Sequence, residues 1–410
     1  MPAYDDQEWP LRLCRVKEAW DLILPSHGQG KAKGEGIVIL HPDTGWTEHP
    51  ELLKGSRYLN SDYKISRNFL VSTPTTDDSY WAIPDSDWRW DFRIQRPTDK
   101  LAKDILDHGL NGGLHPSHGT GTAGLMLSEE GHPNPAPPAS PIFPAYTVPQ
   151  ANFITGIAPL VKVIPCRICR SVILGIDTTW KVNTFTALAQ AIYHGISLVD
   201  QNIGVISISL GGVFKPNFLT DALKAARQNG IIVIAAAGQF AGDLHGVVSP
   251  IFPGNSPHTL CVAGCYEDLS QPKEGFYGIE VDITTPGWAV TVARTKGPPP
   301  NFIIDPKSNG TSYSTALTAG ACALWQAYHN RDLLIKKYGR PFLLDAFRYV
   351  LANTVEKPAG WDNINRGMGV LNVEKLLSLP LPSVATVELV ANSNDWPSTE
   401  WGDSSKWGRV

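Results

Sequence analysis

Short apolar runs alternate along this chain with segments that have the pattern of helices, and this alternation restricts the fold more than any other feature. The apolar runs are residues 36–40, 161–168, 204–210, 231–237 and 258–264. Helical patterns extend from Thr184 to Ile196 and from Asn217 to Gln228. A strand that is apolar along its whole length is buried on both faces, as in a parallel sheet covered by helices. We therefore predict an α/β fold with a mostly parallel central sheet.

Three side chains that can take part in catalysis stand where such a fold places its sites. Ligand sites in these sheets lie at the carboxyl ends of the strands, and Asp43 follows the first apolar run. His118 opens a segment of small residues, which favours a closely packed helix that begins there. Ser312 lies at the expected start of another helix, where free backbone N–H groups and the helix dipole favour a developing oxyanion.

Each of these residues alone has a commoner, structural explanation. A single histidine such as His118 is usually a satisfied structural residue, and a serine at a helix start such as Ser312 is usually an N-cap. A metal pair of His115 and His118 is conceivable, but it lacks a nearby acidic third ligand. The Asp-Thr-Gly at Asp43 also suits an aspartic protease, which needs a second such motif, and the chain has none. Together the three residues supply a nucleophile, a base and a group that orients the base.

Six segments, in order along the chain, resemble the successive signature segments of the subtilisin-like serine peptidases, or subtilases. They are HPDTGWTEHPEL, SHGTGTAG, APLVKVIPCRI, VISISLGG, IVIAAAG and NGTSYSTALTAG, and GMGVLNVEKLL resembles the closing segment of the family. The resemblance extends from about Trp9 to Leu377. It implies a subtilisin-like three-layer sandwich, with helices on both faces of the sheet. It also implies a serine endopeptidase of the subtilisin type that acts on peptide or protein substrates.

The resemblance also implies a role for each residue of the site. Ser312 matches the nucleophile, His118 the general base and then acid, and Asp43 the residue that orients the imidazole. Gln239 stands where the family usually has an asparagine whose amide helps to bind the oxyanion. The amide of Gln239 is one methylene further out, so we expect activity that is reduced if the amide misses the oxyanion.

Two further segments match the substrate-binding parts of the family. The strand that pairs with the substrate backbone corresponds to Ser209, Leu210 and Gly211. One wall of the pocket for the residue before the scissile bond corresponds to Ala236, Ala237 and Gly238. Small residues in this wall imply a roomy pocket with an apolar or broad preference.

Composition excludes several classes of partner and site. The net charge of −4 over 410 residues gives no electrostatic case for nucleic acid, and no apolar stretch is long enough for a membrane span. Six cysteines are too few for a disulfide framework. The pairs Cys166/Cys169 and Cys261/Cys265 allow zinc or a disulfide, but thiols in apolar strands more often pack as small hydrophobes. We expect no cofactor for the chemistry, and no acidic cluster can be assigned to the structural calcium that is common in the family.

The resemblance divides the chain into a peptidase domain, residues 1–382, and a polar tail with three tryptophans, residues 383–410. Residues 72–100 and 132–149 interrupt the domain as insertions, and the tail reads as a loosely attached extension. No signal peptide or prosegment is visible, so we expect a cytoplasmic enzyme, with a secreted mature form as the alternative. Its activity then needs restraint, and we expect residues 72–100 or the tail to cover the cleft or to dock a regulatory protein.

A second function stays open at this point. A catalytically weak protein that keeps the subtilisin fold as a peptide-binding or regulatory scaffold would explain Gln239 and the two insertions.

Overall fold

The computed structural model describes residues 6–22, 33–46, 49–52, 65–69, 117–131, 153–169, 172–174, 183–239, 249–296 and 301–392. The predicted insertions at 72–100 and 132–149 lie outside these ranges, as does His115. Within them, no helix is both long and apolar enough to cross a bilayer.

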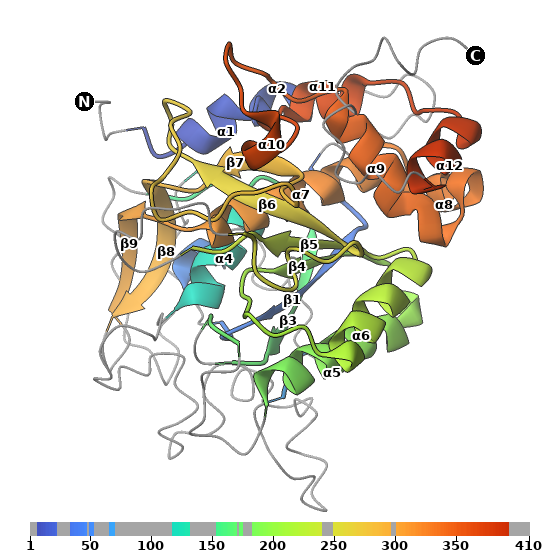
Figure 1. The fold of residues 1–410 in the computed structure, drawn as a ribbon. Coiled ribbons are helices and arrows are strands. Elements are labelled where there is room, and N and C mark those ends of the chain that lie inside the picture. The colour runs from blue at the N-terminus through green and yellow to red at the C-terminus, as the bar shows by residue number, and fades with distance from the viewer. Residues whose placement is uncertain are drawn as a thin grey trace, which may run out of the picture.

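A parallel sheet occupies the centre of the described part (Figure 1), with the strand order β2-β3-β1-β4-β5-β6-β7. Its strands are β1 (Val38–Asp43), β2 (Arg67–Asn68), β3 (Lys162–Arg167), β4 (Ile203–Ile208), β5 (Ile232–Ala236), β6 (Thr259–Cys265) and β7 (Ile283–Pro286). All six pairs of neighbouring strands are parallel. Each of the five apolar runs contributes a strand, so the predicted α/β fold with a mostly parallel sheet is confirmed. An antiparallel pair, β8 (Val290–Lys296) and β9 (Asn301–Ser308), lies outside this sheet.

Helices cover both faces of the sheet. α5 (Thr184–Ser197) and α6 (Asn217–Gln228) pack side by side on one face (Figure 1), and their bounds match the predicted helical patterns. α4 (His118–Leu127) and the long α7 (Thr311–Tyr328) pack against the other face and against each other. The three-layer arrangement expected from the resemblance is therefore present.

The period of two along a strand explains how one sheet supplies two cores. On β1, Ile39 lies in the hydrophobic cluster that contains the residues of α4 and α7. Its neighbours Val38 and Leu40 lie in the cluster that contains the residues of α5 and α6. Residues 41 and 43 continue the same alternation, so His41 and Asp43 point toward the face covered by α4 and α7.

Further helices complete the described part of the chain. They are α1 (Trp9–Leu13), α2 (Val16–Trp20), η1 (Pro50–Leu52), η3 (Val199–Gln201), α8 (Arg331–Tyr338), η4 (Arg340–Phe342), α9 (Leu343–Ala352), α10 (Asn363–Arg366), α11 (Val373–Ser378) and α12 (Val384–Asn392). The helix α12 differs from the loosely attached tail that we expected after residue 382. It packs against α8 and α9, and Val387 and Val390 are buried there, so apolar burial holds this part of the tail. Residues 393–410 lie outside the described ranges.

Three neighbouring strands bring the predicted site residues to one edge of the sheet. Asp43 ends β1, Ser209 directly follows β4, and Gly238 lies two residues beyond β5. Since these strands are adjacent and parallel, their carboxyl ends meet at the edge where α4 and α7 begin.

Candidate active site

Asp43 and His118 form the central contact of the site. Nδ1 of His118 lies 2.8 Å from Oδ1 of Asp43, and both side chains are buried. Gly119 makes this approach possible, because a Cβ at this position would lie 2.2 Å from the carbonyl oxygen of Gly45. The backbone N–H of Gly119 also donates to Oγ1 of Thr44, so the start of α4 is fixed on the loop after β1. The predicted helix start at His118 is confirmed.

The environment of Asp43 keeps its carboxylate ionised. Burial alone raises the pKa of Asp43, but the charge and hydrogen bond of His118, assisted by the nearby His41, outweigh burial and hold this pKa well below its usual range. The N–H of Thr44 also donates to Oδ1 at 2.6 Å. An ionised carboxylate accepts the proton on Nδ1 of His118, which fixes the tautomer with the basic nitrogen at Nε2.

A second histidine, which the sequence reasoning missed, lies against the other oxygen of Asp43. Nε2 of His41 is 3.5 Å from Oδ2 of Asp43, and His41 is completely buried. The indole N–H of Trp46 donates to Nδ1 of His41 at 3.0 Å. Because an indole nitrogen only donates, Nδ1 of His41 accepts and its proton sits on Nε2.

The hydrogen bonds of His41 continue into α4. Nε2 of His41 lies 3.0 Å from Oγ1 of Thr122, whose hydroxyl donates to the backbone oxygen of His118 at 3.2 Å. A directed series of donors therefore runs from Trp46 through His41 and Thr122 to the backbone oxygen of His118. Two spacings in the sequence signal it, because His41 is two residues before Asp43 on a strand and Thr122 is four after His118 on a helix.

Ser312 is the second residue of α7, as predicted, but its hydroxyl is bonded to Ser209. Oγ of Ser312 donates to the backbone oxygen of Ser209 at 3.0 Å, and Oγ of Ser209 donates to the backbone oxygen of Ser312 at 3.0 Å. The hydroxyl of Ser312 makes no hydrogen bond to His118 in the described part of the chain. The two helices meet nearby, because the His118 ring lies 6.4 Å from the ring of Tyr313, the next residue of α7.

Gln239 lies at the start of α7, next to the expected nucleophile. Its Oε1 accepts from the N–H of Thr311 at 2.8 Å, and its Nε2 is 3.5 Å from the backbone oxygen of Asn309. The N-cap of α7 is Gly310, which has no side chain to cap the helix, so the oxygen of Gln239 takes over that task. An amide nitrogen has two hydrogens, so the long bond to Asn309 leaves one for another acceptor. The role of Gln239 as an oxyanion donor stays a prediction.

The segments expected to bind substrate are placed together, but part of their backbone is already paired. Gly211 donates its N–H to the oxygen of Val172 at 3.1 Å, and its oxygen accepts from the N–H of Leu174 at 2.8 Å. Ser209 and Leu210 are buried. Since the oxygen of Ser209 also holds the Ser312 hydroxyl, a peptide that adds to this edge must displace bonds made within the chain.

Residues 236–238, which we expected to form one wall of the substrate pocket, are the last residue of β5 and the two residues after it. Ala236 and Ala237 are buried, and the oxygen of Ala237 accepts from the N–H of Ile251 at 2.9 Å. The N–H of Gly238 lies 3.3 Å from Oγ1 of Thr311, so this segment reaches the residue before Ser312.

None of the six cysteines is in a disulfide, and all six are buried. Burial raises the pKa of Cys166 and of Cys265 to about 12, so both remain thiols that pack in the core. In the described residues, no three side chains of the His, Cys, Asp and Glu types gather closely enough to hold a metal ion. Structural calcium stays unassigned.

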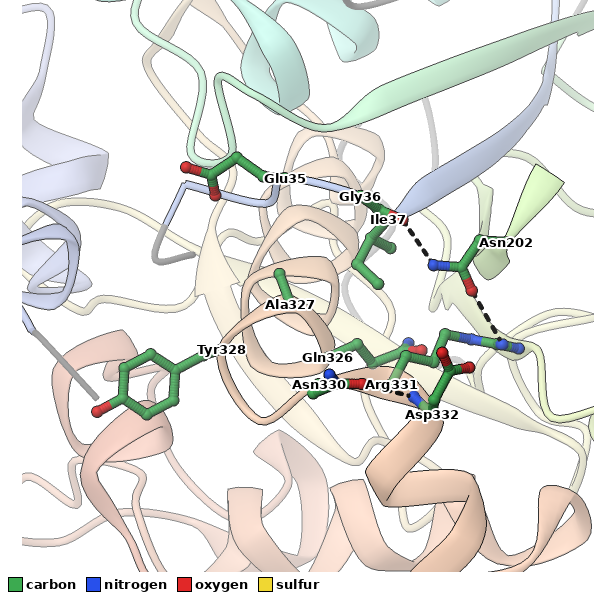
Figure 2. A pocket seen from close by; sticks show the side chains of 10 residues that line it. All are labelled: Glu35, Gly36, Ile37, Asn202, Gln326, Ala327, Tyr328, Asn330, Arg331 and Asp332. Atoms are coloured by element: carbon green, nitrogen blue, oxygen red, sulfur yellow. Dashed lines mark hydrogen bonds between the residues drawn. The ribbon is translucent and has the colours of Figure 1, made fainter. Parts of the chain in front are cut away.

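A separate cavity of about 220 Å³ lies at the opposite end of the sheet (Figure 2). Its lining residues are Glu35, Gly36, Ile37, Asn202, Gln326, Ala327, Tyr328, Asn330, Arg331 and Asp332. Figure 2 shows Asn202 hydrogen-bonded both to the backbone oxygen of Gly36 and to the guanidinium of Arg331. Residues 37 and 202 precede the strands β1 and β4, so this cavity is at the amino ends of the strands and does not belong to the site.

Comparison with known proteins gives one family. The model of the subtilase family matches residues 34–369. The chain is 23% identical to an extracellular protease of Xanthomonas campestris pv. campestris, over 76% of this chain and 46% of that protein. It is 29% identical to thermitase of Thermoactinomyces vulgaris, over 42% of this chain and 53% of that protein. The chain thus spans about half the length of these curated relatives.

The fold has a counterpart among solved structures. The crystal structure of MycP1 with its N-terminal propeptide removed matches with a TM-score of 0.56 at 19% identity, over 92% of this chain and 98% of that one. At this identity the likeness concerns the fold alone.

Proposed function

Because this chain belongs to the subtilase family, we propose that it is a serine endopeptidase that hydrolyses peptide bonds through an acyl-enzyme on Ser312. The observation that carries the proposal is the buried contact of 2.8 Å between Asp43 and His118. It fixes the imidazole in the tautomer that can take a proton from a serine hydroxyl. Peptides and proteins are the proposed substrates.

The chemistry follows from these three side chains. Oγ of Ser312 attacks the scissile carbonyl carbon while its proton passes to Nε2 of His118. His118 then gives this proton to the leaving amine as the C–N bond breaks, which leaves the acyl group on Ser312. Water attacks the ester in the second half, with His118 again as base and then acid. Asp43 stabilises the imidazolium that forms in each half.

Ser312 must first turn its hydroxyl from Ser209 toward His118. We propose that this half-buried serine does so by rotation about χ1, since side-chain rotations are fast compared with peptide hydrolysis. At the start of α7, backbone N–H groups and the helix dipole face the negative charge that develops on the carbonyl oxygen. We propose that the amide nitrogen of Gln239 adds a further donor there.

A second candidate function is a catalytically weak scaffold that binds peptides. Three observations favour it: the Ser312 hydroxyl is bonded to Ser209, the backbone of Gly211 is already paired, and Gln239 turns its oxygen toward α7. Such a protein would bind peptides and leave them intact.

A fluorophosphonate probe tests the proposal, because it reacts with serines that a base activates. We expect the wild-type protein to gain one covalent adduct, measured by intact mass. Ser312→Ala should abolish the adduct. Ser314→Ala is the matched control, because Ser314 lies on the same helix but bonds to the backbone oxygens of Thr285 and Pro286 in the core. A folded wild-type protein that never gains the adduct overturns the endopeptidase proposal in favour of the scaffold.

The location of the protein is a separate question. The comparisons do not support the predicted cytoplasmic location, because one of the relatives is an extracellular protease. This relative favours the alternative, a secreted mature form. The regulatory partner and the structural calcium remain predictions that await a binding measurement.

A further inference from the structure

One isoleucine side chain lies between the two glycines of the expected substrate site. A Cβ on Gly211 would lie 2.7 Å from Cδ1 and 2.8 Å from Cγ1 of Ile251. A Cβ on Gly238 would lie 2.8 Å from Cγ1 and 2.9 Å from Cδ1 of the same residue. Such distances are too short for real carbon contacts. The space that the two glycines leave open is therefore filled by Ile251.

Hydrogen bonds hold the backbone around Ile251 in place. Its own N–H donates to the oxygen of Ala237 at 2.9 Å. The next residue, Phe252, exchanges two hydrogen bonds with Gly212, of 2.8 and 3.1 Å. The segment is thus fixed to the ends of both β4 and β5, and an isoleucine is stiff at χ1 because it is branched at Cβ.

The position of Ile251 is close to the expected nucleophile. Ser209, two residues before Gly211, exchanges hydrogen bonds with Ser312. Gly238 donates to Thr311, the residue before Ser312. The space between the two glycines therefore lies beside the serine, where the resemblance places the side chain next to the attacked carbonyl. Phe276 fills more of this space, since a Cβ on Gly238 would lie 2.7 Å from its ring.

We propose that Ile251 restricts the residue that supplies the scissile carbonyl to glycine, alanine or serine. This inference rests on the proposed function, because it concerns the substrate of the same site. It replaces the expectation of a roomy pocket, which was drawn from the small residues 236–238 alone. Small residues leave room only where no other side chain enters, and here Ile251 enters from a segment that is distant in the sequence.

The test compares fluorogenic peptides that differ only in the residue before the scissile bond, with alanine, leucine or phenylalanine at that position. For a wild-type pocket closed by Ile251, we expect kcat/KM for alanine to exceed that for phenylalanine by about 100-fold or more, since one methylene in a pocket changes kcat/KM by roughly 10- to 200-fold. Ile251→Ala should raise kcat/KM for leucine and phenylalanine and reduce the preference by at least about 10-fold.

Two further variants control the experiment. Ile251→Val keeps the branched Cβ and removes only Cδ1, the atom nearest to the Cβ position of Gly211, so it should give a smaller shift toward leucine even if Ile251→Ala folds poorly. Ile364→Ala removes an exposed isoleucine on α10 and should leave the preference unchanged.

The outcomes separate the two proposals. Equal hydrolysis of the alanine and phenylalanine peptides by the wild-type protein, or an unchanged preference in both Ile251 variants, overturns the role of Ile251 and leaves the endopeptidase standing. No hydrolysis of any peptide together with no fluorophosphonate adduct overturns the proposed function, and the inference about Ile251 with it.

Discussion

Trp46 donates its indole N–H to Nδ1 of His41 across 3.0 Å and thereby fixes the proton of His41 on Nε2, the nitrogen that faces Asp43. Asp43 thus lies between two histidines: His118 at 2.8 Å from Oδ1 and His41 at 3.5 Å from Oδ2. His41 lies at Oδ2 of Asp43, so it leaves Oδ1 to accept from the N–H of His118. The orientation of His41 beside Asp43 therefore depends on the indole N–H of Trp46.

Trp46→Phe should remove the hydrogen bond that orients His41. The ring remains, but Nδ1 of His41 loses its donor, and we expect the free energy of unfolding to fall by about 1–3 kcal/mol, the cost of an unsatisfied buried polar group. The position of His41 beside Asp43 then rests on fewer hydrogen bonds, so kcat should fall as well.

Trp20→Phe is the control for that variant. It also loses an indole hydrogen bond, of 3.1 Å to the oxygen of Ile157, but far from the site. It should lower stability without lowering kcat. Equal kcat values for the two variants would show that Trp46 has a structural role only.

Asp43→Asn should abolish most of the activity while the fold remains. An amide at this position donates as well as accepts, so it permits the wrong tautomer of His118, and we expect kcat to fall by about 10⁴-fold. The matched control is Asp345→Asn, which removes another buried carboxylate, one that pairs with Arg227 at 2.7 Å. It should lower stability and leave kcat within a few-fold, as measured with the best cleaved peptide.

Acid should reduce the stability that Asp43 provides. Its pKa is lowered in the folded state, so its contribution is present above the unfolded value of about 3.9 and is lost as the pH falls below that value toward the folded pKa. Urea unfolding from pH 6 to pH 2 should show the wild-type advantage over Asp43→Asn shrinking below about pH 4. A constant difference across this range would contradict the lowered pKa.

Gln239 has two tasks that one substitution separates. Gln239→Glu keeps an oxygen that accepts from Thr311, and a negative charge at the start of α7 is favourable, so stability should be maintained. It removes the N–H donor, so kcat should fall roughly 100- to 1000-fold if this amide binds the oxyanion. Gln239→Ala should lose both the oxygen that accepts from Thr311 and the amide donor, and its free energy of unfolding should fall by about 1 kcal/mol because the cap is lost. Full activity of Gln239→Glu would reject the oxyanion role.

Five of the seven strands could be predicted from the sequence because each contains a short apolar run. The strands β2 and β7 could not, because Arg67–Asn68 and Ile283–Pro286 have no such run and are defined by their pairing with β3 and β6. The approach of Asp43 to His118 was also predictable, since a strand end and a helix start fix both side chains. The role of Ile251 was not, because it depends on the backbone of Gly211 and Gly238, far away in the sequence. The orientation of the Ser312 hydroxyl depends on a rotamer, which no sequence pattern determines.

The start of the tail should carry measurable stability, in contrast to the loose attachment that its polar composition suggested. Val387 and Val390 on α12 are buried against the body of the protein. Each buried valine contributes about 1.5–3 kcal/mol, so a chain that ends at residue 382 should lose roughly 3–6 kcal/mol in urea unfolding. A chain that ends at residue 392 retains α12 and serves as the control. Equal stability of the two truncated chains would show that α12 is not held by these valines, and the polar composition of residues 383–410 would then describe the whole tail.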